Sequence, residues 1–193
     1  MHREERIAIW VGDQAKIPSL AAKNAARMRH PDRGTGDDSH RTGMDISWLT
    51  DRIAVGGGIW TPENMAKVAR AGITHIIDMQ IEFDDTPLAA EHSIAVLWNP
   101  TDDDFEPKPA VLFQRGVDFA QAAFQGDDAK LLIHCAAGIH RAPMMALAIL
   151  GSMGWQVEDA MDLIEGRRPV ADLAEVYVQS VEEFLDGSRQ QQA

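Results

Sequence analysis

One nine-residue segment holds the side chains with the clearest capacity for chemistry. Residues 134–142 read His-Cys-Ala-Ala-Gly-Ile-His-Arg-Ala, and Cys135 is the only cysteine in the chain of 193 residues. Arg141 follows it within the same segment, and Gly138 lies midway between them. A thiolate is a strong nucleophile, and a planar guanidinium can hold two phosphate oxygens at once. The spacing therefore predicts a loop that presents a phosphate dianion to a sulfur nucleophile.

The residues on either side of this segment indicate how the loop is positioned. Residues 130–133 predict a short buried strand, and residues 142–153 predict a buried helix. Small residues in the loop let successive backbone N–H groups turn inward, and the positive end of the helix points at the same place. We therefore expect phosphate to bind the backbone N–H groups of the loop and the arginine side chain. The positive electrostatic potential of these groups also favours the thiolate form of Cys135. The residues expected to bind phosphate are Ala136, Ala137, Gly138, Ile139, His140 and Arg141.

Two histidines in the segment have different expected roles. We expect His134 to order the loop by hydrogen bonding rather than to react. His140 is either a loop residue without direct chemistry or a group that faces the substrate. The competing interpretation of Cys135 is a buried, inert thiol, but that interpretation gives no reason for the glycine, the arginine and the flanking elements to coincide.

The rest of the chain alternates apolar strand patterns with helical patterns. Two short strands about a turn are predicted within 46–55, and further strands at 73–79, 94–98 and 130–133. Helices are predicted from Thr61, as N-cap, to Gly72, and at 109–124, 142–153, 157–165 and 173–185. This alternation predicts an α/β fold with a central parallel-rich sheet flanked by helices. Ligands of such sheets bind at the carboxyl ends of the strands, where the Cys135 loop is expected.

The first 43 residues differ from the remainder. Residues 7–11 predict a short strand, 19–29 a helix, and the polar, breaker-rich stretch 30–40 a linker. The expected organisation is therefore an N-terminal extension and linker over 1–43, a catalytic domain over 44–187 and a tail over 188–193.

Composition limits the classes of partner and location. The net charge is −12, although residues 1–43 are slightly basic, and an acidic body disfavours nucleic acid and anionic membranes. The longest apolar run, Pro143–Leu150, is far shorter than the ~18 residues of a membrane span. No signal-peptide pattern opens the chain, and a single cysteine suits a reducing, cytoplasmic location. No Cys/His spacing predicts zinc, so we expect neither metal nor cofactor. The oligomeric state stays undetermined.

The loop resembles the signature of the cysteine-dependent dual-specificity phosphatases of the protein tyrosine phosphatase superfamily, His-Cys-x-x-Gly-x-x-Arg-Ser/Thr. The resemblance covers about residues 44–187 and includes flanking matches at 49–57, 71–79, 113–120 and 166–169. It implies a phosphotyrosine-phosphatase-like fold and hydrolysis of phosphate monoesters on tyrosine, serine or threonine of proteins, through a phosphocysteine intermediate. The implied partner is a phosphorylated protein or peptide.

The resemblance also implies a general acid on the loop before the helix at 109–124. That loop, residues 99–107, contains three consecutive aspartates. Counting back from Phe113 to the usual family spacing identifies Asp103, with Asp102 as the alternative acid. Two further possibilities are that Asp104 is the general acid, or that the loop is a solvated acidic turn that supplies no general acid.

One position departs from the family pattern. Ala142 follows Arg141 where most of the family has serine or threonine, and the phosphatases of regenerating liver share this Arg-Ala-Pro ending. The missing hydroxyl implies slow turnover, limited by breakdown of the phosphocysteine.

Three functions remain compatible with these residues. An active phosphatase is favoured, and the absence of lysine from the loop favours phosphoproteins over phosphoinositides. A catalytically weak phosphatase fold that captures phosphorylated partners is the first alternative. A rhodanese-like sulfurtransferase is the second, although the aspartates at phosphatase spacing and His134 disfavour it.

Overall fold

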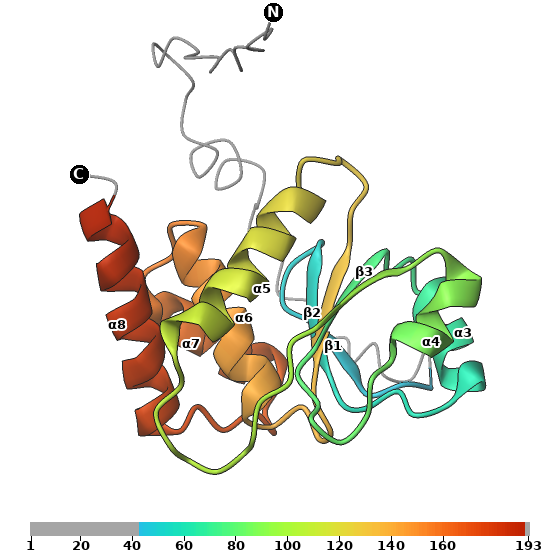
Figure 1. The fold of residues 1–193 in the computed structure, drawn as a ribbon, viewed down its shortest axis with the longest axis horizontal. Helices are drawn as coiled ribbons and strands as arrows, with labels where there is room; N and C mark the ends of the chain where they lie inside the picture. Colours follow the sequence, from blue (N-terminus) through green and yellow to red (C-terminus); the bar gives the residue numbers. More distant parts are fainter. Residues whose placement is uncertain (1–42, 192–193) are drawn as a thin grey trace, which may run out of the picture.

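The computed structural model describes residues 43–191, which build a five-stranded sheet with helices on both faces (Figure 1). The strands are β1 (Ile46–Trp48), β2 (Ile53–Gly56), β3 (His75–Asp78), β4 (Ala95–Trp98) and β5 (Leu131–His134). Their order in the sheet is β1-β2-β5-β3-β4, and all neighbours are parallel except β1 and β2. The predicted parallel-rich sheet is confirmed, and the strand that precedes Cys135 is its central one.

Helices cover the two faces unequally. On one face lie α3 (Pro62–Arg70), α4 (Thr86–Ala89) and a 3₁₀ turn (Ala90–His92). The larger core on the other face contains α5 (Ala110–Ala123), α6 (Arg141–Ser152), α7 (Val157–Arg167) and α8 (Glu175–Gln191). Alternation along the strands separates the two cores, since Leu131 and Ile133 belong to the larger core and Leu132 to the smaller. None of the helices within 43–191 is long and apolar enough to cross a membrane.

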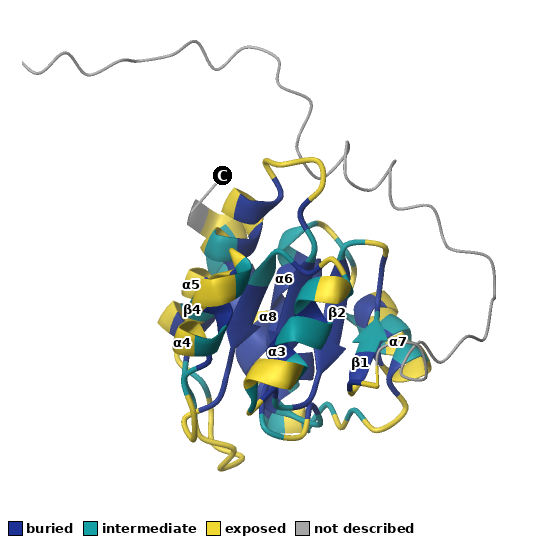
Figure 2. Cartoon of the chain, turned by 90° about the vertical axis from the view of Figure 1, so that its right-hand side faces the viewer, coloured by how far each residue is buried: buried dark blue, intermediate teal, exposed yellow. Residues whose placement is uncertain are grey.

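Helix α6 is the most enclosed element of the larger core. Every residue from Arg141 to Gly151 is buried, and the helix contacts β2, β5, α5, α7 and α8 (Figure 2). A helix enclosed on all sides cannot shift without disturbing the core. The loop that enters it from β5 is therefore fixed at both ends.

Most of the predicted elements within 43–191 are present. The N-cap prediction is confirmed, because the Thr61 hydroxyl accepts a hydrogen bond from the backbone N–H of Asn64 at 3.2 Å. Helix α4 and the 3₁₀ turn were not predicted, since four residues are too few to show a helical period. The strand, helix and linker predicted before residue 43 lie outside the described residues.

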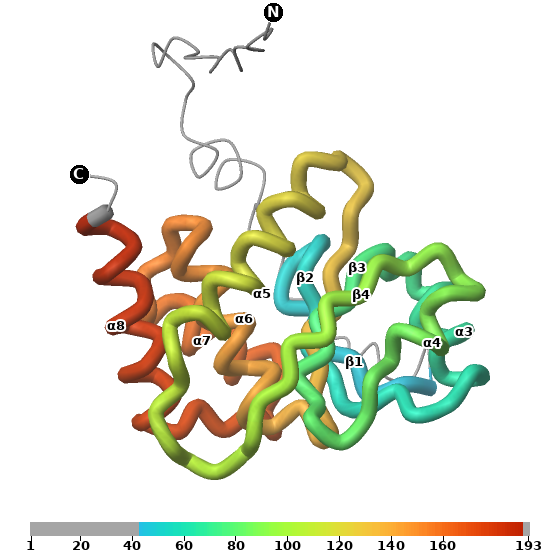
Figure 3. Tube along the Cα trace, in the orientation of Figure 1, coloured from blue at the N-terminus to red at the C-terminus, as the bar shows by residue number. Residues whose placement is uncertain are grey.

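The parallel register aligns the carboxyl ends of four strands. Gly56, His134, Asp78 and Trp98 lie side by side across the sheet. The chain leaves these ends in loops that run along the lower edge of the view in Figure 3, together with the segment that enters α8. Every residue expected to do chemistry lies on, or next to, one of these loops.

Candidate active site

Residues 135–140, between β5 and α6, form a loop in which four consecutive carbonyl oxygens, those of residues 136–139, point outward; we call it the phosphate loop. The carbonyls of residues 136–139 each accept a hydrogen bond from outside the loop, at 2.6–3.1 Å. The donors are the backbone N–H groups of Gly58 and Asp172 and the Arg168 guanidinium, which binds two carbonyls. In a trans peptide the N–H points away from the carbonyl. The N–H groups of residues 137–140 therefore face the inside of the loop.

The sulfur of Cys135 accepts a hydrogen bond from one of these inward N–H groups. The backbone N–H of Gly138 donates to Sγ at 3.2 Å, and the cysteine is 1% exposed. Gly138 has a φ of +64°, and a Cβ there would lie 2.5 Å from the carbonyl oxygen of Gly56. Only glycine fits that position. The predicted anion-binding nest and the predicted nucleophile are thus brought together by the same few residues.

Arg168 holds the phosphate loop from behind, a role that the sequence did not reveal. Its side chain is nearly fully buried, and Nε and Nη2 bind the carbonyls of Gly138 and Ala137. The opposite side of the guanidinium binds both carboxylate oxygens of Asp45, at 2.7 and 2.8 Å. Arg168 belongs to the Gly-Arg-Arg-Pro match at 166–169, where neither arginine was distinguished from the other.

Arg141 is fixed by Glu82, a second residue that no pattern in the sequence connects with the site. Nη1 and Nη2 each donate to a Glu82 carboxylate oxygen at 2.9 Å, and Nη1 also binds the carbonyl of Thr101. Among the described residues, Nε is buried and has no hydrogen-bond partner. The edge formed by Nε and the second hydrogen of Nη2 is therefore left for two oxygens of an anion.

The charges around Arg141 keep this donor edge positive. Burial alone lowers the pKa of Arg141, but the hydrogen bonds that it donates to Glu82 and the nearby charges of Cys135, Glu82 and Asp103 outweigh burial, so the pKa is raised. The same hydrogen bonds lower the pKa of Glu82. Guanidinium and carboxylate therefore stay ionised together across the physiological range.

The segment from Asn99 to Pro109, which we call the acid loop, brings one of its aspartates to the phosphate loop. Asp103 Oδ2 lies 3.0 Å from Nδ1 of His140 and 3.8 Å from Nε of Arg141. Asp104 instead forms an ion pair with Lys108, and none of the contacts described within 43–191 brings Asp102 to the phosphate loop. Within residues 43–191, Asp103 is thus the aspartate of this loop that lies beside the unused edge of Arg141.

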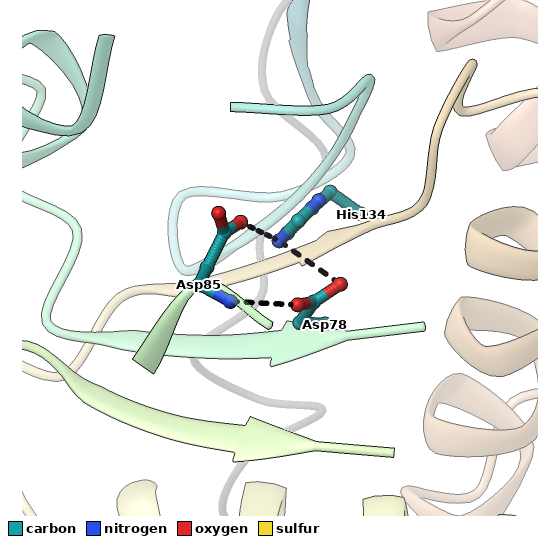
Figure 4. Close-up of side chains that lie close together, drawn as sticks. All are labelled: Asp78, Asp85 and His134. Atoms are coloured by element: carbon teal, nitrogen blue, oxygen red, sulfur yellow. Dashed lines mark hydrogen bonds and ion pairs between the residues drawn. The ribbon is translucent and has the colours of Figure 1, made fainter. Parts of the chain in front are cut away.

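The side chain of His134 points away from the phosphate loop into a buried cluster with two aspartates (Figure 4). Its Nε2 lies 3.0 Å from Asp85 Oδ2 and 3.7 Å from Asp78 Oδ1. Burial raises the pKa of Asp78 to about 6. The sequence predicted that His134 orders the loop by hydrogen bonding. The contacts described for its ring go to the two aspartates.

This cluster also fixes the segment that carries Glu82. The three ligand atoms lie within 4.8 Å of one another, a spacing that a metal ion can bridge. Both oxygens of Asp78, however, already accept backbone hydrogen bonds, from Gln80 at 2.9 Å and from Asp85 at 3.1 Å. These bonds close the turn over residues 78–85 and so hold Glu82 facing Arg141. We therefore interpret the cluster as an anchor for this turn.

Comparison with known sequences identifies a matching family and similar proteins. The sequence model described as "Dual specificity phosphatase, catalytic domain" matches residues 60–186. Mouse protein tyrosine phosphatase type IVA 3 is 30% identical over 99 residues, which cover 50% of this chain and 56% of that protein. Arabidopsis thaliana protein-tyrosine-phosphatase IBR5 is 31% identical over 62 residues, 32% of this chain and 24% of that protein. The chain thus spans about half, or less, of the length of these curated relatives.

Solved structures share the fold at low sequence identity. PTPMT1, in a complex with PI(5)P, superposes with a TM-score of 0.69 at 17% identity, over 77% of this chain and 99% of that one. Human DUSP28 superposes with a TM-score of 0.65 at 18% identity, over 75% and 95% of the two chains. The predicted phosphotyrosine-phosphatase-like fold is confirmed.

Proposed function

Because the chain belongs to the dual specificity phosphatase catalytic-domain family, we propose that it hydrolyses phosphate monoesters of proteins through a phosphocysteine on Cys135. One observation carries this proposal. The carbonyls of residues 136–139 point outward, so the N–H groups of residues 137–140 face the inside of the loop, where Gly138 already donates to the sulfur, beside an unused donor edge of Arg141. Donors arranged in advance around a nucleophile stabilise the charge that develops on a transferring phosphoryl group.

The first chemical step transfers the phosphoryl group to sulfur. The Cys135 thiolate attacks phosphorus, the Sγ–P bond forms and the ester P–O bond breaks. Inward N–H groups of the phosphate loop and the free edge of Arg141 bind the equatorial oxygens. Asp103 gives a proton to the leaving oxygen, a contribution of about 10²–10⁴-fold for a well-placed general acid.

The second step returns the free enzyme. Water attacks the phosphocysteine, the Sγ–P bond breaks and Asp103, now ionised, takes a proton from the water. Ala142 offers no hydroxyl to the departing sulfur. We therefore expect this step to limit turnover.

The charges around the phosphate loop favour a phosphorylated protein as substrate. Glu82, Asp103 and Asp172 surround the loop, and its residues 136–140 include no lysine. The PTPMT1 structure contains PI(5)P, but an inositol lipid adds negative charge that these carboxylates repel. A free thiol nucleophile works best under reducing conditions, so we place the activity in the cytoplasm.

Turnover of a small aryl phosphate tests the proposal. We expect Cys135→Ser to abolish hydrolysis and Asp103→Asn to lower kcat/KM by about 10²-fold or more, with loss of the alkaline limb of the pH profile. Asp102→Asn is the matched control and should leave the rate within about twofold of the wild type. Hydrolysis that survives Cys135→Ser would contradict the proposal.

A phosphate-binding module without significant turnover is the second candidate, and Ala142 is the observation that favours it. Such a module would bind a phosphotyrosine peptide at least as tightly as an enzyme does, yet show no release of phosphate over hours. Cys135→Ser would then leave both binding and the rate unchanged.

A further inference from the structure

We propose that His140 is a positioning residue for the general acid, sharing the working proton with Asp103 and holding that carboxyl over the phosphate loop. The inference rests on the proposed function, which assigns Asp103 the role of acid. Nδ1 of His140 lies 3.0 Å from Oδ2 of Asp103, a hydrogen-bonding distance. The same oxygen lies 3.8 Å from Nε of Arg141, the donor left for phosphate. The shared proton is therefore next to the place where a bound phosphoryl group is expected.

The second nitrogen of the ring faces another carboxylate. Nε2 of His140 lies 3.4 Å from Oδ2 of Asp172, whose backbone N–H binds the carbonyl of Ile139 at 2.8 Å. A neutral imidazole has one N–H and one acceptor nitrogen. If both carboxylates are ionised, they favour a hydrogen on each ring nitrogen; if the ring is neutral with its hydrogen toward Asp172, Nδ1 accepts from a protonated Asp103. In both cases the group of Asp103, His140 and Asp172 holds one proton more than a lone neutral imidazole between two carboxylates.

The other groups around the His140 ring do not displace the proton that it shares with Asp103. Arg141, which follows His140, is the one cation that the described contacts bring near the pair, and Glu82 neutralises it. Tyr177 on α8 donates its hydroxyl hydrogen to Asp103 Oδ1 at 3.3 Å. Burial and the nearby acid charges raise the pKa of Tyr177, so it remains a neutral donor. The groups that face the pair are thus Asp172 from the segment before α8, Arg141 from α6, Tyr177 from α8 and Phe105 from the acid loop.

Phe105 adds an apolar contact that holds the acid loop against the histidine. Its ring meets the edge of His140 at a centroid distance of 5.0 Å and stacks on Tyr177 at 5.8 Å and 6°. Its backbone N–H donates to the Tyr177 hydroxyl oxygen at 3.0 Å. Phe105 has a φ of +57°, which is costly for a bulky side chain and persists only where surrounding contacts impose it. These contacts therefore fix Asp103 at the distance from His140 that proton sharing needs.

The proton that the Asp103–His140 pair gives up in the first chemical step is recovered in the second. When the Sγ–P bond forms and the ester P–O bond breaks, the Asp103–His140 pair passes its proton to the leaving oxygen. When water attacks and the Sγ–P bond breaks, the proton of that water returns to the pair.

The test compares phenyl phosphate, whose leaving group needs a proton, with nitrophenyl phosphate, whose leaving group barely does. We expect His140→Ala to lower kcat/KM for phenyl phosphate by about tenfold or more, and for nitrophenyl phosphate by only about twofold. The alkaline limb of kcat/KM should also move to lower pH, because an isolated aspartic acid loses its proton at about pH 4. His140→Asn, which keeps an N–H donor in a similar place but cannot accept a proton, should show the same substrate selectivity.

The controls separate this inference from the proposed function. His92 lies in the 3₁₀ turn, far from His140 along the chain. His92→Ala should therefore leave kcat/KM for both esters within about twofold of the wild type. Equal losses on both esters with an unchanged pH profile, in either His140 variant, would mean that His140 only supports the phosphate loop, and overturn this inference alone. A wild type that hydrolyses neither ester overturns the proposed function and this inference with it.

Discussion

Replacing Arg168 by lysine tests whether the outward carbonyls create the phosphate site. The guanidinium binds the carbonyls of Ala137 and Gly138 and both oxygens of Asp45 at once. A lysine ammonium keeps the charge but lacks the planar fork, so we expect one carbonyl to lose its partner. A buried carbonyl without a partner costs about 1–3 kcal/mol, unless its peptide turns and takes the N–H out of the site. A cost of about 2 kcal/mol corresponds to roughly 30-fold weaker binding of phosphate.

Calorimetric titration with inorganic phosphate measures this change, and kcat/KM on an aryl phosphate should fall in parallel. Asp45→Asn is the matched control, because it breaks the ion pair and leaves both carbonyl bonds intact. The Asp45 side chain is 59% exposed, so its pair with Arg168 is worth about 0–1 kcal/mol and phosphate binding should change less than about fivefold. Phosphate binding by Arg168→Lys within about threefold of the wild type would refute the reasoning, since it would mean that the loop orients its N–H groups without this partner.

Three further changes probe the neighbouring groups. Ala142→Ser should raise kcat at least about twofold and shorten the lifetime of the phosphoenzyme, because a hydroxyl assists the departing sulfur; a smaller gain, with no phosphoenzyme in burst kinetics, would contradict slow breakdown. Glu82→Gln should lower kcat/KM about tenfold on aryl phosphates, because Arg141 loses the carboxylate that orients its free edge; an unchanged rate would show that Arg141 needs no such support. For Asp78, the folded pKa of about 6 lies above the ordinary 3.8, so its ionisation lowers stability as pH rises from about 4 to 6, by up to about 3 kcal/mol. Asp78→Asn should remove that fall in urea unfolding, and the same slope in wild type and variant would contradict the raised pKa.

The sequence predicted the parts of the structure that depend on neighbouring residues. Thr61 and Pro62 start α3 as expected, because capping uses residues within one turn. The phosphate loop could be predicted for the same reason, since Cys135, Gly138 and Arg141 are close along the chain. Helix α4 is too short for a periodic signal and was missed.

The residues that hold the loop in place come from distant parts of the chain, so the sequence pattern could not connect them. Arg168 reaches Gly138 across 30 positions, and Glu82 reaches Arg141 across 59. Both are charged residues, and the sequence alone gives no reason to distinguish them from charged residues that face the solvent. His140 remained open for the same reason, because its partners Asp103 and Asp172 lie on two other segments.

The most direct test of the central claim is to find the phosphoryl group on the sulfur. Quenching of aryl phosphate turnover with a denaturant, without acid, within the first catalytic cycle, followed by mass spectrometry of the peptides, locates any covalent phosphate. We predict one phosphoryl group per chain, attached to Cys135, and none in Cys135→Ser. Turnover with no adduct on Cys135, or with the phosphoryl group on His134 or His140, would contradict the proposed mechanism.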